Sequence, residues 1–215
     1  MADMAEPRAG ARLLLQFARE PLPGQVKTRM YPFLDAVGAC ELHCALLTHT
    51  ARQLAAVSGC TRELWIAGNP AHPVLERAAA LGQATLRRQA GVDLGERMQH
   101  ALASALERAS RAVLVGSDCP ELDAAYVEAA FDALSTADVV LGPALDGGYV
   151  LIGVRRLNPA LFHSVSWGSD RVLAQTRERI ASLGWRSTLL EPLRDIDRPE
   201  DLVAWEAVAG SVSAG

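Results

Sequence analysis

The sequence predicts an α/β fold built on a mostly parallel mixed sheet. Short apolar runs of strand length alternate along the chain with amphipathic segments of helix length. This alternation is typical of parallel sheets that are covered by helices. Two apolar segments, 138–143 and 149–154, are separated by too few residues for a helix. Part of the sheet is therefore expected to be antiparallel, or the loop between these strands crosses a cleft.

The first half of the chain follows this alternation. The apolar segment 11–18 ends at a Pro/Gly loop, which suits a buried strand. Apolar residues recur at three- and four-residue spacing in the segment 36–57, directly after Asp35, which predicts an amphipathic helix. Asp93 and Glu96 have the spacing of a capping box at the start of another helix. Strands are expected at 61–68 and 84–89, and helices at 72–81 and 94–110.

The second half continues in the same way. The uninterrupted apolar run in 112–117 is typical of a fully buried strand. Pro199 stands where the first turn of the closing helix is expected. The remaining strands are expected at 138–143, 149–154 and 186–191, and the remaining helices at 123–134, 169–184 and 199–209.

Composition and charge narrow the function classes. With 215 residues, 50% of them hydrophobic, the chain suits one substantial core, so we expect a single domain. The net charge of −4 argues against nucleic-acid and membrane partners. No signal peptide or apolar run of transmembrane length is visible, which favours the cytoplasm. The four cysteines lack the spacing of a metal site.

The loop after the first predicted strand reads PLPGQVKTR and contains the only lysine of the chain. Gly24 allows backbone amides to approach an anion, Lys27 supplies a compact cation, and Thr28 supplies a hydroxyl. Arg29 adds a planar fork that suits phosphate. The loop is predicted to cradle phosphate, although its spacing is not that of a P-loop. The alternative is a solvated turn with two surface cations.

Carboxylates follow two later elements. Asp118 comes directly after the buried strand at 112–117, where an unpaired carboxylate would be costly and a divalent metal is a natural partner. Asp195 and Asp197 are two residues apart, so an extended backbone directs both to one side. Each of these motifs also suits a helix cap. Taken together, Asp118 and Asp197, with Asp195 as a substitute, are predicted to bind a metal.

Two further loops offer polar groups. GPALDGGY carries Asp146, Gly147, Gly148 and Tyr149, and it is predicted to contact an acceptor, although a tight hairpin turn explains the glycines equally well. Trp167, between helix-start signals, either walls this pocket or packs in the core. Near the start of the helix at 94–110, the residues that could face an anion or a nucleotide ring are Gln89, Gly95 and Arg97; a capped helix is the simpler account.

Six motifs in order resemble the DUF2064 family of bacterial proteins, which is described as similar to 2-phospholactate guanylyltransferase. The motifs are FAREPLPGQVKTRM, GVDLGERM, GSDCPEL, VVLGPALDGGYVLIG, SWGSDRVL and DIDRPEDL, and the resemblance spans about 12–208. It implies a Rossmann-like, three-layer glycosyltransferase-A (nucleotide-diphospho-sugar transferase) fold. It also implies that the nucleotide binds over the first strand, against Phe17, Ala18 and the loop from Pro23 and Gly24 to Arg29. This chain departs from the family pattern at Arg19-Glu20-Pro21, Met30 and Arg198.

The resemblance and the loops together favour a transferase that uses Mg²⁺ or Mn²⁺, a nucleotide and a small-molecule acceptor. In a nucleotidyltransferase, an acceptor phosphate attacks the α-phosphorus of a nucleoside triphosphate, and Lys27 and Arg29 neutralise the phosphates. In a glycosyltransferase, Asp146 is the candidate base that activates an acceptor hydroxyl. We favour the first narrowly over the second. An inactive nucleotide-binding domain is a third reading, whereas a dehydrogenase is excluded because GxGxxG is missing after the first strand.

Overall fold

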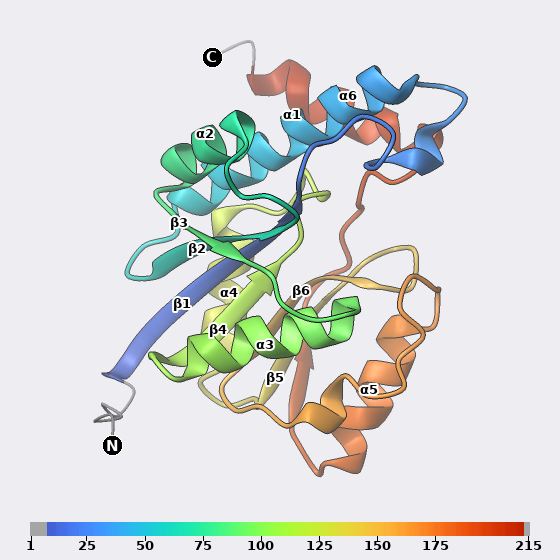
Figure 1. Cartoon of the computed structure of the whole chain (residues 1–215). Coiled ribbons are helices and arrows are strands. Elements are labelled where there is room, and N and C mark those ends of the chain that lie inside the picture. Colours follow the sequence, from blue (N-terminus) through green and yellow to red (C-terminus); the bar gives the residue numbers. More distant parts are fainter. Residues whose placement is uncertain (1–7, 213–215) are drawn as a thin grey trace.

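The computed structural model describes residues 8–212. Residues 1–7, part of the segment in which no signal peptide was recognised, lie outside the described residues. A seven-stranded sheet with the order β3-β2-β1-β4-β6-β5-β7 forms the centre of the molecule (Figure 1). Its strands are β1 (Arg8–Arg19), β2 (Thr61–Ala67), β3 (Thr85–Arg88), β4 (Ala109–Val115), β5 (Val139–Pro143), β6 (Tyr149–Val154) and β7 (Ser187–Leu189).

The sheet is mixed, as the sequence predicts. β1 pairs in parallel with β2 and β4, β2 with β3, and β5 with β7. Only β6 runs in the opposite direction, and it lies between β4 and β5. The carboxyl ends of the six parallel strands and the start of β6 therefore lie at the same edge of the sheet.

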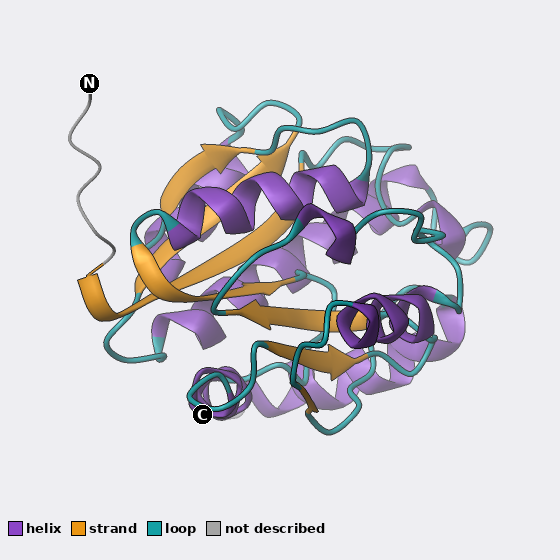
Figure 2. Cartoon of the chain, turned by 90° about the horizontal axis from the view of Figure 1, so that it is seen from below, coloured by secondary structure: helices purple, strands orange, loops and turns teal. Residues whose placement is uncertain are grey.

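Helices cover both faces of the sheet and give three layers (Figure 2). The helices are α1 (Ala36–Ala55), α2 (Pro73–Gly82), α3 (Leu94–Leu106), α4 (Ala124–Ala133), α5 (Val172–Ser182) and α6 (Leu202–Val212). Short 3₁₀ turns are η1 (Thr28–Met30), η2 (Pro159–Leu161) and η3 (Pro199–Asp201). No helix within residues 8–212 combines the length and hydrophobicity needed to span a bilayer.

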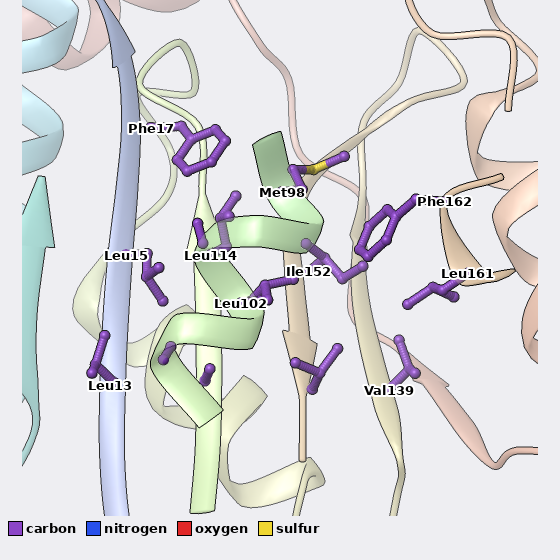
Figure 3. Packing of buried hydrophobic residues seen from close by; sticks show 14 of the residues in the cluster. Leu13, Leu15, Phe17, Met98, Leu102, Leu114, Val139, Ile152, Leu161 and Phe162 are labelled. Atoms are coloured by element: carbon purple, nitrogen blue, oxygen red, sulfur yellow. The ribbon is translucent and has the colours of Figure 1, made fainter. Parts of the chain in front are cut away.

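Alternate residues of the strands build the two cores. Leu13, Leu15 and Phe17 of β1 pack against α3 together with Leu114 and Ile152 (Figure 3). The intervening residue Leu14 belongs to the cluster on the opposite face, which α4 covers. Because successive strand side chains point to opposite faces, the continuous apolar runs in the sequence correspond to strands that are buried on both sides.

The predicted boundaries differ from the structure in one instructive place. The helix expected over 94–110 ends at Leu106, and β4 begins at Ala109 rather than at 112. Ala109 pairs with Arg8 at the start of β1. The helical periodicity extends into this segment, but pairing with a strand that is distant in the sequence determines its conformation.

Candidate active site

A cleft of about 730 Å³ opens at the carboxyl edge of the sheet. Its lining comes from the loops after β1, β3, β4 and β5, from α3 and from the turn that precedes α5. Most of the residues predicted to form the site share this cleft. They are Phe17, Ala18, Lys27, Thr28, Arg29, Gln89, Arg97, Asp118, Asp146, Gly148, Tyr149, Trp167 and Asp197.

Lys27 lies at the centre of an ion-pair network. Its Nζ is 2.9 Å from Asp118 Oδ1 and 3.5 Å from Asp197 Oδ1, and it donates a hydrogen bond to the carbonyl of Ile196. Arg29 completes the network, with an Nη1 atom 2.7 Å from Asp197 Oδ2. Only 3% of the Lys27 side chain is exposed. The lysine predicted to contact phosphate thus contacts both predicted metal ligands.

The backbone of Lys27 is also unusual. Its φ of 50° lies in the left-handed region, which residues other than glycine seldom adopt. It precedes the η1 turn and, at that point, the chain reverses toward α1. This conformation costs free energy, and the three contacts made by the ammonium group offset it.

Hydrogen bonds fix the backbone position of Asp118. Its backbone carbonyl accepts a hydrogen bond of 2.8 Å from Ile196 N–H, which ties the loop after β4 to the DIDRP segment. The preceding Ser117 donates to Phe17 O at 2.7 Å and accepts from Gln16 Nε2 at 2.9 Å. Oδ1 is buried against Lys27, whereas 43% of the side chain is exposed, so the rest of the carboxylate faces the cleft.

The surroundings of the three aspartates predicted as metal ligands differ. Burial by itself raises the pKa of Asp118, but the Lys27 ammonium and the neighbouring basic side chains together outweigh this effect and lower the pKa below its ordinary value. Burial, together with Asp146, raises the pKa of Asp195 to about 6. Asp197 lines the cleft and forms an ion pair with Lys27. Asp195 does neither.

The pair formed by Asp118 and Asp197 suits a divalent cation in its geometry and its chemistry. One ammonium group contacts both carboxylates, so a single cation can bridge them. Among residues 8–212, no group of three or more His, Cys, Asp or Glu side chains is arranged to hold a metal. An ion here would have two carboxylates and complete its shell with phosphate oxygens and water, as Mg²⁺ commonly does.

His43 also lines the cleft, although it was not among the residues predicted to form the site. The residue is 5% exposed, and Nε2 lies 3.1 Å from the carbonyl of Arg19, to which it donates. Burial lowers the pKa of His43, so the ring is neutral near pH 7. The buried-face periodicity of α1 is the only signal that could have placed it here.

One wall of the cleft is apolar and adjoins the ends of β1 and β3. Phe17, Ala18, Val92 and Leu94 contribute to it, and Gln89 provides a polar group among them. Arg97 approaches from α3, where its Nε donates to the carbonyl of Gly91 at 3.1 Å.

Three of the predicted nucleotide contacts do not line the cleft. Pro23 and Gly24 are exposed and lie outside the cleft lining. Gly95 is buried, and the indole of Trp167 leaves no room there, because a Cβ on Gly95 would lie 2.6 Å from Trp167 Nε1. Of the loop predicted to cradle phosphate, only the second half therefore lines the cleft.

The opposite wall comes from the loop between β5 and β6. Asp146 is exposed, and its Oδ1 accepts a 2.9 Å hydrogen bond from Gly148 N–H. Gly147 does not line the cleft but packs against the backbone of Asp170, where a Cβ would lie 2.1 Å from the carbonyl oxygen. Its φ of 91° adds a second reason for glycine.

Tyr149 contributes its ring to this wall rather than its hydroxyl group. The hydroxyl lies 4.0 Å from Met98 Sδ, and burial raises the pKa of Tyr149 above its ordinary value. Burial thus keeps the phenol protonated. The direction of this hydroxyl could not be read from the sequence, because it depends on the packing of β6 beneath α3.

Comparisons with known proteins identify the family of this chain. A family described as "Uncharacterized protein conserved in bacteria (DUF2064)" matches residues 50–169. A 3-phospho-D-glycerate guanylyltransferase of Phenylobacterium zucineum (strain HLK1) is 33% identical over 177 residues, which cover 80% of this chain and 79% of that relative. The resemblance found from the six motifs is therefore confirmed.

Solved structures support the fold. A crystal structure from Desulfovibrio desulfuricans G20, classified as a nucleotide-diphospho-sugar transferase, has a TM-score of 0.80 and 32% identity, and it covers 88% of this chain and 83% of its own. A CMP:2-keto-3-deoxy-manno-octonic acid synthetase complexed with CTP has a TM-score of 0.60 at 13% identity and covers 94% and 99% of the two chains. The second likeness concerns the fold alone.

The expected nucleotide-diphospho-sugar transferase fold is thus confirmed. The guanylyltransferase relative and the nucleotide-diphospho-sugar transferase structure each match most of this chain, and this protein is a transferase as well. By its sequence, the chain belongs to the DUF2064 family.

Proposed function

We propose that this protein is a metal-dependent nucleotidyltransferase that joins a nucleoside triphosphate to a small phosphorylated acceptor, with residues 12–208 acting as one domain. The observation that carries the proposal is the convergence of Lys27, Arg29, Asp118 and Asp197 on one point of the cleft. Two cations and two carboxylates together suit a triphosphate with its metal. The relative's name points to GTP and to a phosphorylated carboxylic acid as the substrate classes.

In this reaction an oxygen of the acceptor phosphate attacks the α-phosphorus in line. A P–O bond forms, the bond between the α-phosphorus and the bridging oxygen breaks, and pyrophosphate leaves with the electron pair. Asp118 and Asp197 would hold Mg²⁺ or Mn²⁺, which supplies charge neutralisation at the phosphate oxygens. Arg29 and Lys27 neutralise the remaining charge, and Lys27 exchanges its carboxylate partners for phosphate when the nucleotide binds.

A second candidate function is glycosyl transfer from a nucleotide sugar. The observation that favours it is Asp146, an exposed carboxylate in the cleft wall that could take the proton of an acceptor hydroxyl. Asp146→Asn distinguishes the two reactions. It would abolish glycosyl transfer that depends on a base, whereas nucleotidyl transfer to an already ionised phosphate needs no base at this position.

A thermal-shift screen followed by a turnover assay tests the proposal. Nucleoside triphosphates and nucleotide sugars are compared with Mg²⁺, with Mn²⁺ and with EDTA, on the wild type, Asp118→Asn and the surface control Asp132→Asn. A ligand that binds only the folded state raises the melting temperature, so donor selectivity is directly visible. We expect metal-dependent stabilisation by a triphosphate, lost in Asp118→Asn and kept in Asp132→Asn.

Pyrophosphate release is then measured with 3-phosphoglycerate as the acceptor. Release that requires donor, acceptor and metal together supports nucleotidyl transfer. If only a nucleotide sugar raises the melting temperature, the result would favour the glycosyltransferase over the nucleotidyltransferase. If no nucleotide shifts the melting temperature under any condition, the protein is not a nucleotide-dependent transferase of either kind.

A further inference from the structure

Gln89 places a polar side chain in the apolar wall of the cleft. It follows β3 directly, and its backbone N–H donates to Ile66 O at 2.9 Å, so the residue continues the edge of the sheet. Its side-chain Nε2 donates to Trp65 O at 2.9 Å and to Ala18 O at 3.2 Å. The amide therefore spans from β2 to β1 across the strand ends.

These two contacts determine the orientation of the amide. An amide nitrogen has two hydrogens, and both are used by strand carbonyls. A rotation by half a turn would set Oε1 against those same carbonyl oxygens and leave the donors without partners, so it is unfavourable. Among the described residues, none donates a hydrogen bond to Gln89 Oε1. Gln89 lines the cleft, and its Oε1 is an acceptor of fixed orientation that no described residue uses.

Each of the neighbouring backbone acceptors already has a donor. The carbonyl of Ala18 accepts from Gln89, that of Arg19 accepts from His43 at 3.1 Å, and that of Ala67 accepts from Glu20 N–H at 3.0 Å. Gln89 Oε1, by contrast, has both lone pairs free, because no described residue donates to it. Gln89 shares the cleft wall with the apolar residues Phe17, Val92 and Leu94, so a nucleobase that packed against them could present its polar edge to this oxygen.

The chemistry of the four bases then distinguishes one of them. A carbonyl oxygen has two lone pairs and can accept from two adjacent donors. Guanine carries N1–H and N2–H₂ side by side. Adenine and cytosine each place a ring-nitrogen acceptor beside their amino group, and uracil flanks N3–H with two carbonyl oxygens. Those acceptors would face Gln89 Oε1 or stay without a partner, which costs free energy.

We infer that Gln89 reads the base of the nucleotide and selects guanine. The inference rests on the proposed nucleotide-dependent function and adds a residue that sets its specificity. Gln89 touches the substrate base and takes no part in the chemical step, so its loss changes which nucleotide binds more than how fast the bound nucleotide reacts.

Binding of GTP and inosine triphosphate tests the inference, because inosine lacks only the N2 amino group of guanine. Dissociation constants are measured by calorimetry with Mg²⁺ for GTP, ITP, ATP, CTP and UTP. Loss of one hydrogen bond with a neutral partner is worth about 1 kcal/mol, which predicts roughly fivefold weaker binding of ITP to the wild type. ATP, CTP and UTP should bind more weakly still.

Gln89→Leu should bind GTP and ITP equally, because the leucine cannot accept from the amino group. Gln99→Leu is the matched control, since Gln99 is a half-buried glutamine of α3 that does not line the cleft, and it should keep the wild-type ratio. The comparison of GTP with ITP on the wild type needs no variant, so it remains decisive even if Gln89→Leu fails to fold.

The possible outcomes distinguish failure of the role of Gln89 from failure of the proposed nucleotidyltransferase function. Metal-dependent binding of all triphosphates without a preference for guanine, or equal binding of GTP and ITP to the wild type, overturns the role of Gln89 and leaves the nucleotidyltransferase intact. A GTP/ITP ratio that survives in Gln89→Leu likewise overturns it. Failure of every triphosphate to bind overturns both.

Discussion

At the scale of single residues, Lys27 neutralises the two carboxylates at the centre of the cleft. Its ammonium holds two carboxylates together that would otherwise repel each other, and it is almost completely buried in doing so. A lysine suits this role because its compact charge on a flexible stem can contact several oxygens and then move. The same ammonium lies between Asp118 and Asp197, the two carboxylates that would hold the proposed divalent cation.

Replacing Lys27 by methionine should therefore have two opposite effects. Turnover should fall by about 10²-fold, the usual loss when one group that stabilises developing charge is removed. Affinity for free Mn²⁺ should rise, because the carboxylates no longer have an internal cation. Steady-state kinetics and electron paramagnetic resonance titration of Mn²⁺ measure the two effects. Unchanged turnover in Lys27→Met would remove this residue from the mechanism.

Gly95 affects the cleft through Trp167. The indole lies so close to Gly95 that an added methyl group would meet Nε1 at 2.6 Å. Gly95→Ala should displace Trp167, raise KM for the acceptor and change the intrinsic fluorescence, since Trp167 lies in the cleft wall. The fluorescence change must disappear when Gly95→Ala is combined with Trp167→Phe. A spectrum unchanged by Gly95→Ala would contradict this packing.

At the scale of elements, Asp138 joins three parts of the chain at the edge of the sheet remote from the cleft. It stands before β5, is 4% exposed, and accepts hydrogen bonds from Arg155 Nη2 at 2.7 Å and from Arg186 N–H at 2.9 Å. Arg156 adds a further contact of 2.9 Å. Burial by itself raises the pKa of Asp138, but these donors outweigh it and hold the pKa at about 2.

The ionised form of Asp138 therefore stabilises the fold at pH values above its unfolded pKa, and this contribution is lost as the pH falls from about 4 through about 2. Asp138→Asn should lower the free energy of unfolding by about 2 kcal/mol at pH 7, because charged hydrogen bonds are lost. Urea unfolding measured between pH 7 and pH 3 should show a constant difference that begins to narrow below about pH 4. A difference that is equally large at pH 3 and pH 7 would argue that the carboxylate charge does not matter.

At the scale of the whole molecule, one core cluster supports two loops of the site that are far apart in the sequence. Met30 follows Arg29, Ile196 lies between Asp195 and Asp197, and both are buried together with Leu46 of α1. The partly buried Trp205 of α6 covers this cluster. The network around Lys27 thus depends on packing between the start and the end of the chain.

Ile196→Ala should destabilise the protein and weaken the site at once. Truncating a fully buried isoleucine costs about 2–5 kcal/mol, and the shift of Asp197 should also reduce metal-dependent nucleotide binding. Ile180→Ala on α5 is the matched control, because Ile180 is 1% exposed but packs in a different cluster. We expect it to destabilise comparably in urea and to leave nucleotide affinity unchanged under native conditions. Equal losses of affinity in both variants would indicate a general effect of stability.

The sequence by itself determined the class of the fold, the alternation of elements and the place of the site. These properties follow from local patterns: apolar periodicity predicts β1 and α1, and polar residues after apolar runs predict that Asp118 and Lys27 lie at the carboxyl edge. The short LDGG connection also indicated the antiparallel strand.

Only the tertiary structure decided which atoms meet. The strand order that inserts β6 between β4 and β5, the pairing of Ala109 with Arg8, and the burial of the Lys27 ammonium between two carboxylates are examples. So is the fixed orientation of the Gln89 amide. Each of these joins segments that are distant in the sequence, and their arrangement depends on packing of the whole core, which local periodicity does not encode.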